Sequence, residues 1–140
     1  MTDAGWEQFP VEADVGIRGW GPTRAEAFAR TTLGVLALVV DPADVQPVER
    51  REVRAQGAGP ETLLASWINE CLYVHEIEGF AVRDVEMTVC TDTIAHGLLV
   101  GELLDTARHR TGAVVKAVTM HGLAVESRPD RHEARVVVDV

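Results

Sequence analysis

Residues 60–76, PETLLASWINECLYVHE, decide the fold of this chain. A proline stands at the first helical position, where its missing N–H costs nothing, and apolar residues recur after it at intervals of three and four. These residues are Leu63, Leu64, Trp67, Ile68, Cys71 and Leu72, with His75 continuing the pattern. The spacing predicts a helix over 60–76 that buries one apolar stripe and is closed by Gly79.

A second helix is predicted over residues 24–40. Thr23 and Glu26 form the T-x-x-E pattern of a capping box, and apolar residues keep helical spacing until Asp41-Pro42. Residues 15–20, just before this helix, alternate apolar and small or polar types around Gly16 and Gly19, which predicts a short strand in which backbones approach closely. The N-terminus before that strand is expected to be loose.

Strand patterns fill most of the remaining chain. Residues 45–55 are charge-rich, which predicts an edge strand. A second strand is predicted over 80–91, with Val85, Met87 and Val89 on one face. The alternation of apolar and polar residues in it is interrupted near Arg83-Asp84, which indicates a turn or bulge there. Further strand-like segments are 94–104, 114–121, 123–127 and 134–140, with a polar, irregular stretch at 105–112 and a turn at Pro129-Asp130. We therefore expect a single α+β domain over 1–140, with two main helices packed on a largely antiparallel sheet.

Charge and composition limit the partners. Thirteen basic against 22 acidic residues give a net charge of −9, which disfavours direct, nonspecific binding to nucleic acid. The longest apolar run, 33–40, is too short to cross a membrane, and the first ten residues do not resemble a secretion signal. We expect a cytoplasmic protein without a membrane partner, whose Cys71 and Cys90 are reduced core residues.

Common catalytic signatures are missing from the sequence. No G-x-x-x-x-G-K-[ST] or G-x-G-x-x-G loop is present, which argues against ATP hydrolysis, and no G-x-S-x-G elbow is present for acyl-enzyme chemistry. The histidines at 75, 96, 109, 121 and 132 lack zinc-site spacing.

One cluster of polar residues could support acid–base chemistry. Carboxylates, an arginine, a lysine and imidazoles fall within twenty residues: Glu102, Asp105, Arg108, His109, Lys116 and His121. The structural alternative is a solvated loop with a capping aspartate.

A second cluster could hold a metal ion. Asp14 opens the predicted first strand, while Asp139 and the terminal carboxylate of Val140 follow the run Val136-Val137-Val138. If that last strand lies beside the first, three oxygen anions would favour a hard cation, Ca²⁺ or Mg²⁺. The alternative is that Asp14 accepts a local backbone hydrogen bond and that Asp139 is only solvated.

Six sequence blocks in order closely resemble the archease family. They are ADVGIRGWGPTRAEAF at 13–28, WINECLY at 67–73, EGF at 78–80, GELLDTARH at 101–109, VKAVTMHGLAVE at 115–126 and the final VDV at 138–140. Each block is weak alone, but together they cover nearly the whole chain.

The resemblance implies a function and a cofactor. Archeases are accessory proteins of the RtcB-type RNA ligase, which joins tRNA exon halves. The resemblance implies that this chain promotes guanylylation of the ligase and its multiple turnover, and reaches tRNA only indirectly through that transient partner. It also implies a divalent cation, calcium with magnesium as the alternative, held by Asp14, Asp139 and Val140. The polar cluster around Glu102 would then face the partner or its nucleotide.

Three positions depart from the family pattern. Val11 stands where the family usually has histidine, Met120 where it has tyrosine, and His132 where it has tryptophan. The proposed ligands are unchanged, but the partner-facing surface is affected. Two other functions remain open: a small metal-dependent phosphoester hydrolase that uses Glu102 and His109, and a chaperone-like binding module, whose sign would be an exposed apolar patch.

Overall fold

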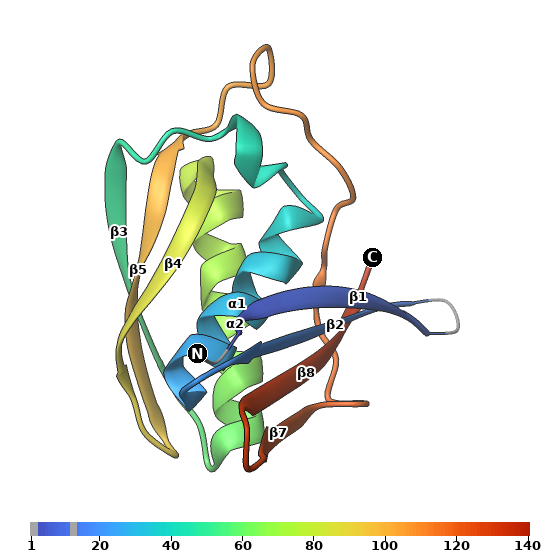
Figure 1. The fold of residues 1–140 in the computed structure, drawn as a ribbon. Coiled ribbons are helices and arrows are strands. Elements are labelled where there is room, and N and C mark those ends of the chain that lie inside the picture. The colour runs from blue at the N-terminus through green and yellow to red at the C-terminus, as the bar shows by residue number, and fades with distance from the viewer. Residues whose placement is uncertain (1–2, 12–13) are drawn as a thin grey trace.

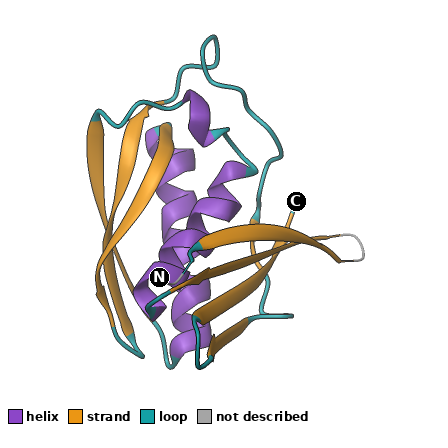
Figure 2. Ribbon diagram, in the orientation of Figure 1, coloured by secondary structure: helices purple, strands orange, loops and turns teal. Residues whose placement is uncertain are grey.

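Two helices form the middle layer of the molecule, between two antiparallel sheets (Figure 1). The computed structural model describes residues 3–11 and 14–140. Helix α1 (Arg24–Ala37) contacts strands of both sheets, and so does α2 (Pro60–Glu78). Figure 2 shows the helices in purple with orange strands on either side. The expected α+β architecture, two helices on antiparallel strands, is therefore confirmed.

The first sheet contains strands from both ends of the chain. Its order is β1-β2-β8-β6, and β7 also pairs with β8. The bounds are β1 Gly5–Val11, β2 Asp14–Gly21, β6 Ala117–Val118, β7 Ala124–Ser127 and β8 His132–Asp139. The last strand of the chain thus lies inside its sheet, where it is the partner of β2, β6 and β7.

The second sheet has the order β3-β5-β4, with β3 Glu49–Gln56, β4 Phe80–Cys90 and β5 Ile94–Leu103. The predicted edge position of the charged strand is confirmed, because within the described residues β3 pairs with β5 alone. A short 3₁₀ helix, η1 (Pro42–Asp44), precedes it, so this strand begins later than predicted. Val45 instead lies in a small buried cluster with Val40 and Ala81.

The helix predictions are confirmed at three of four ends. Thr23 caps α1 by accepting a hydrogen bond from the Glu26 amide at 3.1 Å, and Gly79 ends α2 in the left-handed region at φ 61°. The prediction that α1 continues to residue 40 is wrong. Leu38 and Val39 use their carbonyls to accept from Ala113 (2.8 Å) and Gly112 (2.7 Å), and Val40 bridges Thr111. Pairing with residues 111–113 therefore replaces the last helical turn.

Three strand predictions need correction. The N-terminal segment is not loose, because β1 pairs with β2 along seven residues. The bulge near Arg83-Asp84 is confirmed by a register shift between Val82 and Asp84, but a second shift between Met87 and Val89 was not predicted. This second shift pairs Val89 with His96 and leaves the Val89 side chain 39% exposed, while Val85 and Met87 face the core. Within 114–121 only Ala117–Val118 forms a strand.

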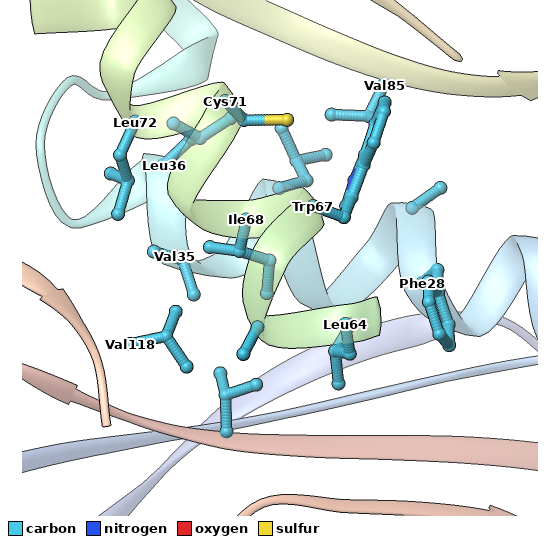
Figure 3. Packing of buried hydrophobic residues seen from close by; sticks show 14 of the residues in the cluster. Phe28, Val35, Leu36, Leu64, Trp67, Ile68, Cys71, Leu72, Val85 and Val118 are labelled. Carbon is cyan, nitrogen blue, oxygen red and sulfur yellow. The ribbon is translucent and has the colours of Figure 1, made fainter. Parts of the chain in front are cut away.

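The core lies on the facing surfaces of the helices and the two sheets. Figure 3 shows Trp67, Ile68 and Leu64 of α2 among Phe28, Val35 and Leu36 of α1, with Val85 and Val118 from the two sheets on opposite sides.

Cys71 is fully buried and Cys90 is half-buried, and both are free thiols. Burial raises the pKa of both thiols, which suits the predicted structural role. Neither helix of the described chain has the length and apolar character required to cross a bilayer.

Candidate functional site

The carboxylate of Glu102, near the end of β5, is surrounded by hydrogen-bond donors. It accepts from the Gln46 amide at 2.7 Å, from two guanidinium nitrogens of Arg108 at 2.6 and 3.0 Å, and lies 3.0 Å from His109 Nε2. Three of these four contacts are to Oε2 and one is to Oε1. The hydrogen bonds of Arg108, then those of Gln46 and His109, lower the pKa of Glu102 to about 2. Glu102 is therefore a permanently ionised anchor at neutral pH.

The second member of the predicted acid–base pair, His109, is held from both sides. Its side chain is fully buried, and Nδ1 accepts a hydrogen bond from the Asp105 amide at 2.9 Å. Because Nδ1 accepts, the neutral imidazole carries its proton on Nε2 and donates it to Glu102. Both ring nitrogens are thus used within the protein, and neither is presented to a substrate.

A tight turn brings these groups together. The Asp105 carbonyl accepts from the amides of Arg108 (3.0 Å) and His109 (2.7 Å), and its carboxylate accepts from Ala107 at 3.0 Å. Asp105 is therefore the capping aspartate of the structural alternative, while Arg108 covers Glu102 from the solvent side.

A second carboxylate–arginine contact, which the sequence analysis missed, lies beside the first. Asp44 accepts from Arg110 Nε at 2.8 Å, from a terminal nitrogen of the same guanidinium at 3.0 Å, and from the Arg110 amide at 3.0 Å. These bonds lower the pKa of Asp44 to about 2. The partners are 66 residues apart and belong to no motif, so no local pattern could have revealed them. We call Glu102, Arg108, His109, Asp44 and Arg110 the latch, because they tie the 104–112 connection to residues 41–46.

The structure does not bring Lys116 and His121 into the latch. The Lys116 amide donates to the Asp139 carbonyl at 2.8 Å, so this residue lies beside the end of β8. His121 is exposed in the turn before β7, where its carbonyl accepts from the Thr119 hydroxyl at 3.2 Å. In Figure 1 the 104–112 connection lies at the top of the molecule and the segment before β7 lies low on the right. The single cluster expected from sequence is thus three separate sites.

The strand register places two of the predicted cation ligands at the same end of neighbouring strands. Val15 of β2 pairs with Val138 of β8 on antiparallel strands, and Asp14 and Asp139 are the next residues of the two strands beyond this pair. Both aspartates are half-buried, and Val140 follows at once. No ion pair with a basic residue of the described chain neutralises either aspartate.

The chemistry of these donors fits a hard cation. Two side-chain carboxylates and the terminal carboxylate supply only oxygen, which Ca²⁺ and Mg²⁺ prefer. No group of three His, Cys, Asp or Glu side chains in residues 3–11 and 14–140 is placed to hold a metal ion.

Known proteins share both the sequence and the fold of this chain. Residues 6–140 match the model of the Archease protein family. The archeases of Thermococcus gammatolerans and Pyrococcus abyssi are 37% and 35% identical to this chain over 139 residues, and each match covers 96% of this chain and 98% of the relative. The chain belongs to the archease family.

Solved structures give the same result. The solution structure of protein 1598 of Methanobacterium thermoautotrophicum matches with a TM-score of 0.80 and 27% identity, covering 97% of this chain and 99% of that one. A crystal structure from Thermotoga maritima, described as an archease and possible chaperone, matches with a TM-score of 0.62 at 17% identity, over 96% and 98% of the two chains, and supports the fold alone.

Proposed function

We propose that this protein is a non-catalytic, cytoplasmic accessory factor that activates an RtcB-type RNA ligase by promoting its guanylylation and multiple turnover. The observation that carries the proposal is membership of the archease family along residues 6–140. The latch supports it, because Oε2 of Glu102 and both ring nitrogens of His109, the candidate acid–base pair, are engaged in internal hydrogen bonds.

The charge of the chain supports an indirect role toward RNA. A net charge of −9 opposes close approach to a phosphate backbone, so tRNA is reached through the ligase. Guanylylation also needs a nucleophile, and the single lysine, Lys116, is exposed beside Asp139 with no phosphate-binding loop nearby. The ligase therefore supplies the nucleophile and the nucleotide pocket.

Asp14, Asp139 and the Val140 carboxylate would hold the divalent cation, calcium with magnesium as the alternative. When bound, the cation supplies positive charge that offsets the repulsion between these anions. The residues themselves fix the ends of β2 and β8, and Lys116 lies at the same edge. This edge is the part of the molecule that we propose meets the ligase, and the contact must be transient because the RNA has to enter afterwards.

Ligation under single- and multiple-turnover conditions tests the proposal. Substoichiometric protein should increase formation of the guanylylated ligase and allow repeated turnover, while the protein alone should hydrolyse no nucleotide and seal no RNA. Asp14→Asn should lose the stimulation, whereas Asp130→Asn, in the β7–β8 turn, should keep it. Equal stimulation by both variants, or none by the wild-type protein, would contradict the role of the cation edge or of the ligase. Hydrolysis that disappears in Glu102→Gln would favour the hydrolase instead.

Thermal unfolding tests the cation separately from the ligase. Chelation should lower the melting temperature and added Ca²⁺ should restore it, because a ligand bound only by the folded state stabilises that state. A C-terminal tag converts the Val140 carboxylate to a peptide carbonyl and should weaken the response, while an N-terminal tag should not. Coincident curves under all these conditions would exclude the site.

A chaperone-like binding module is the second candidate. The observation that favours it is the exposure of Tyr73 (61%) and Ile77 (63%), one turn apart on α2 and outside the apolar stripe predicted for this helix. Suppression of the aggregation of an unrelated unfolded protein, lost in Tyr73→Ser with Ile77→Ser, would support this function. Retained suppression in that variant would count against it.

A further inference from the structure

A groove that contains none of the latch residues and none of the proposed cation ligands has no role in the proposed function. It encloses about 360 Å³, within the roughly 300–1,000 Å³ range of small-molecule pockets. It lies between the end of α2, residue Val39 after α1, and the extended segment 111–115. Its lining residues are Val39, Leu72, His75, Glu76, Gly79, Leu104, Thr111, Gly112, Ala113, Val114 and Val115.

The walls of the groove are aliphatic. Val39, Leu72 and Leu104 come from three separate parts of the chain, and Val114 stands at 78% exposure. Such walls favour a ligand with an apolar stem, because moving the stem from water into the groove removes the apolar surface of both from contact with water.

The polar groups at the α2 end of the groove accept hydrogen bonds or carry negative charge, and the hydroxyl of Thr111, on the opposite wall, can both donate and accept. His75 Nδ1 lies 2.8 Å from the Phe80 carbonyl, which can only accept, so in the neutral ring Nε2 is an acceptor. Glu76 adds an exposed carboxylate with no ion-pair partner among the described residues. The last turn of α2 forms part of the wall and brings the partial negative charge of a helix C-terminus. No arginine or lysine is found among the described residues that line the groove.

From this complementarity we propose that the groove binds a small organic amine, a protonated ammonium group on an apolar stem. The ammonium group lies at the α2 C-terminus, near Glu76 and His75, and the stem lies along Leu72, Leu104 and Val115. The volume fits one small molecule rather than a helix or a strand of a partner.

Amide NMR spectra of the isotope-labelled protein, titrated with three ligands of the same stem, test this. 3-Phenylpropylamine should cause saturable shifts at Gly79 and in residues 111–115. 3-Phenylpropanol should bind more weakly, and 3-phenylpropionate should bind at least about tenfold more weakly than the amine because its charge has the wrong sign. Equal affinities, or shifts mapping elsewhere, would overturn the proposal.

Charge reversal on α2 gives a matched pair of variants. Glu76→Lys should weaken binding of the amine about tenfold and strengthen binding of the acid. Glu70→Lys makes the same change in net charge at an exposed position of the same helix that does not line the groove, and should leave both affinities unchanged. The proposal is wrong if the two variants behave alike. Far-UV circular dichroism of both variants establishes that each is folded.

Discussion

Thr32 joins the two helices through a single hydroxyl group. Its Oγ1 accepts from the indole Nε1 of Trp67 at 3.0 Å and donates to the Phe28 carbonyl at 2.6 Å, and both Thr32 and Trp67 are fully buried. A buried donor without an acceptor costs roughly 1–3 kcal/mol. We expect Thr32→Val to lower the free energy of unfolding by about that amount, as measured by urea denaturation.

Thr32→Ser is the control for that variant, because it keeps the hydroxyl and removes only a methyl group. It should lose less stability than Thr32→Val even though valine is closer to threonine in shape. The reverse order of stability would show that packing, rather than the indole hydrogen bond, dominates at this position.

The candidate site residues were predictable from sequence only in part. Local patterns located Asp105 as a possible cap and the run Glu102 to His109 as a cluster, because these residues lie within one turn and the strand before it. The Asp44–Arg110 contact could not be predicted, since it depends on how two distant connections meet. Lys116 and His121 were grouped wrongly with the others. They are close to the latch in sequence, but the extended segment after residue 112 carries them away from it in space.

At the scale of the elements, α2 offers a comparison between its two terminal glycines. A Cβ added at Gly59 or at Gly79 would meet no atom within 4 Å, so space is equal at both. Gly59 has the extended backbone of an N-cap (φ −166°) and no side-chain cap, while Gly79 has φ 61°. Gly59→Ser should stabilise the protein by a few tenths of a kcal/mol. Gly79→Ala should destabilise it by roughly 1 kcal/mol, because alanine is strained there.

Melting temperatures of the two single variants check this pair. Because steric effects are absent at both positions, opposite signs follow from the side-chain cap that serine adds at position 59 and from the left-handed backbone conformation at position 79. A fall of similar size in both variants would show that flexibility at the helix ends matters more than capping.

The same elements show what periodicity can predict. The helices of 24–37 and 60–78 follow from caps and spacing within each segment, and their starts were predicted correctly. β1 was missed because Glu7, Gln8 and Pro10 interrupt its alternation, and its strand character depends on pairing with β2. The division into two sheets depends on β8 inserting between β2 and β6, a pairing across more than 100 residues that no local pattern contains.

For the molecule as a whole, the latch predicts a sensitivity to acid. The pKa of Glu102 falls from 4.5 to about 2 and that of Asp44 from 3.8 to about 2 in the folded protein. Because both are depressed, their stabilising contribution is complete above about pH 4.5 and is lost as pH falls toward 2. Glu102→Gln with Asp44→Asn should therefore be less stable at pH 7 and lose less further stability between pH 5 and 3 than the wild-type protein.

Melting temperatures across that pH range test the prediction. Glu126→Gln is the control, because this exposed carboxylate pairs with Arg128 outside the latch. Parallel pH profiles for the wild-type protein and the double variant would show that the latch carboxylates do not govern the acid response.

The position of β8 also governs when the chain can fold during synthesis. β6 and β7 have no other strand partner within the described chain, and β2 otherwise pairs only with β1. While residues 132–139 remain inside the ribosomal exit tunnel, the emerged chain can form both helices and the β3-β5-β4 sheet, yet the apolar helix surface meant for the first sheet stays open to solvent. Until residues 132–139 have emerged, the nascent protein is consequently more exposed to proteases and to self-association, because the first sheet cannot form without β8.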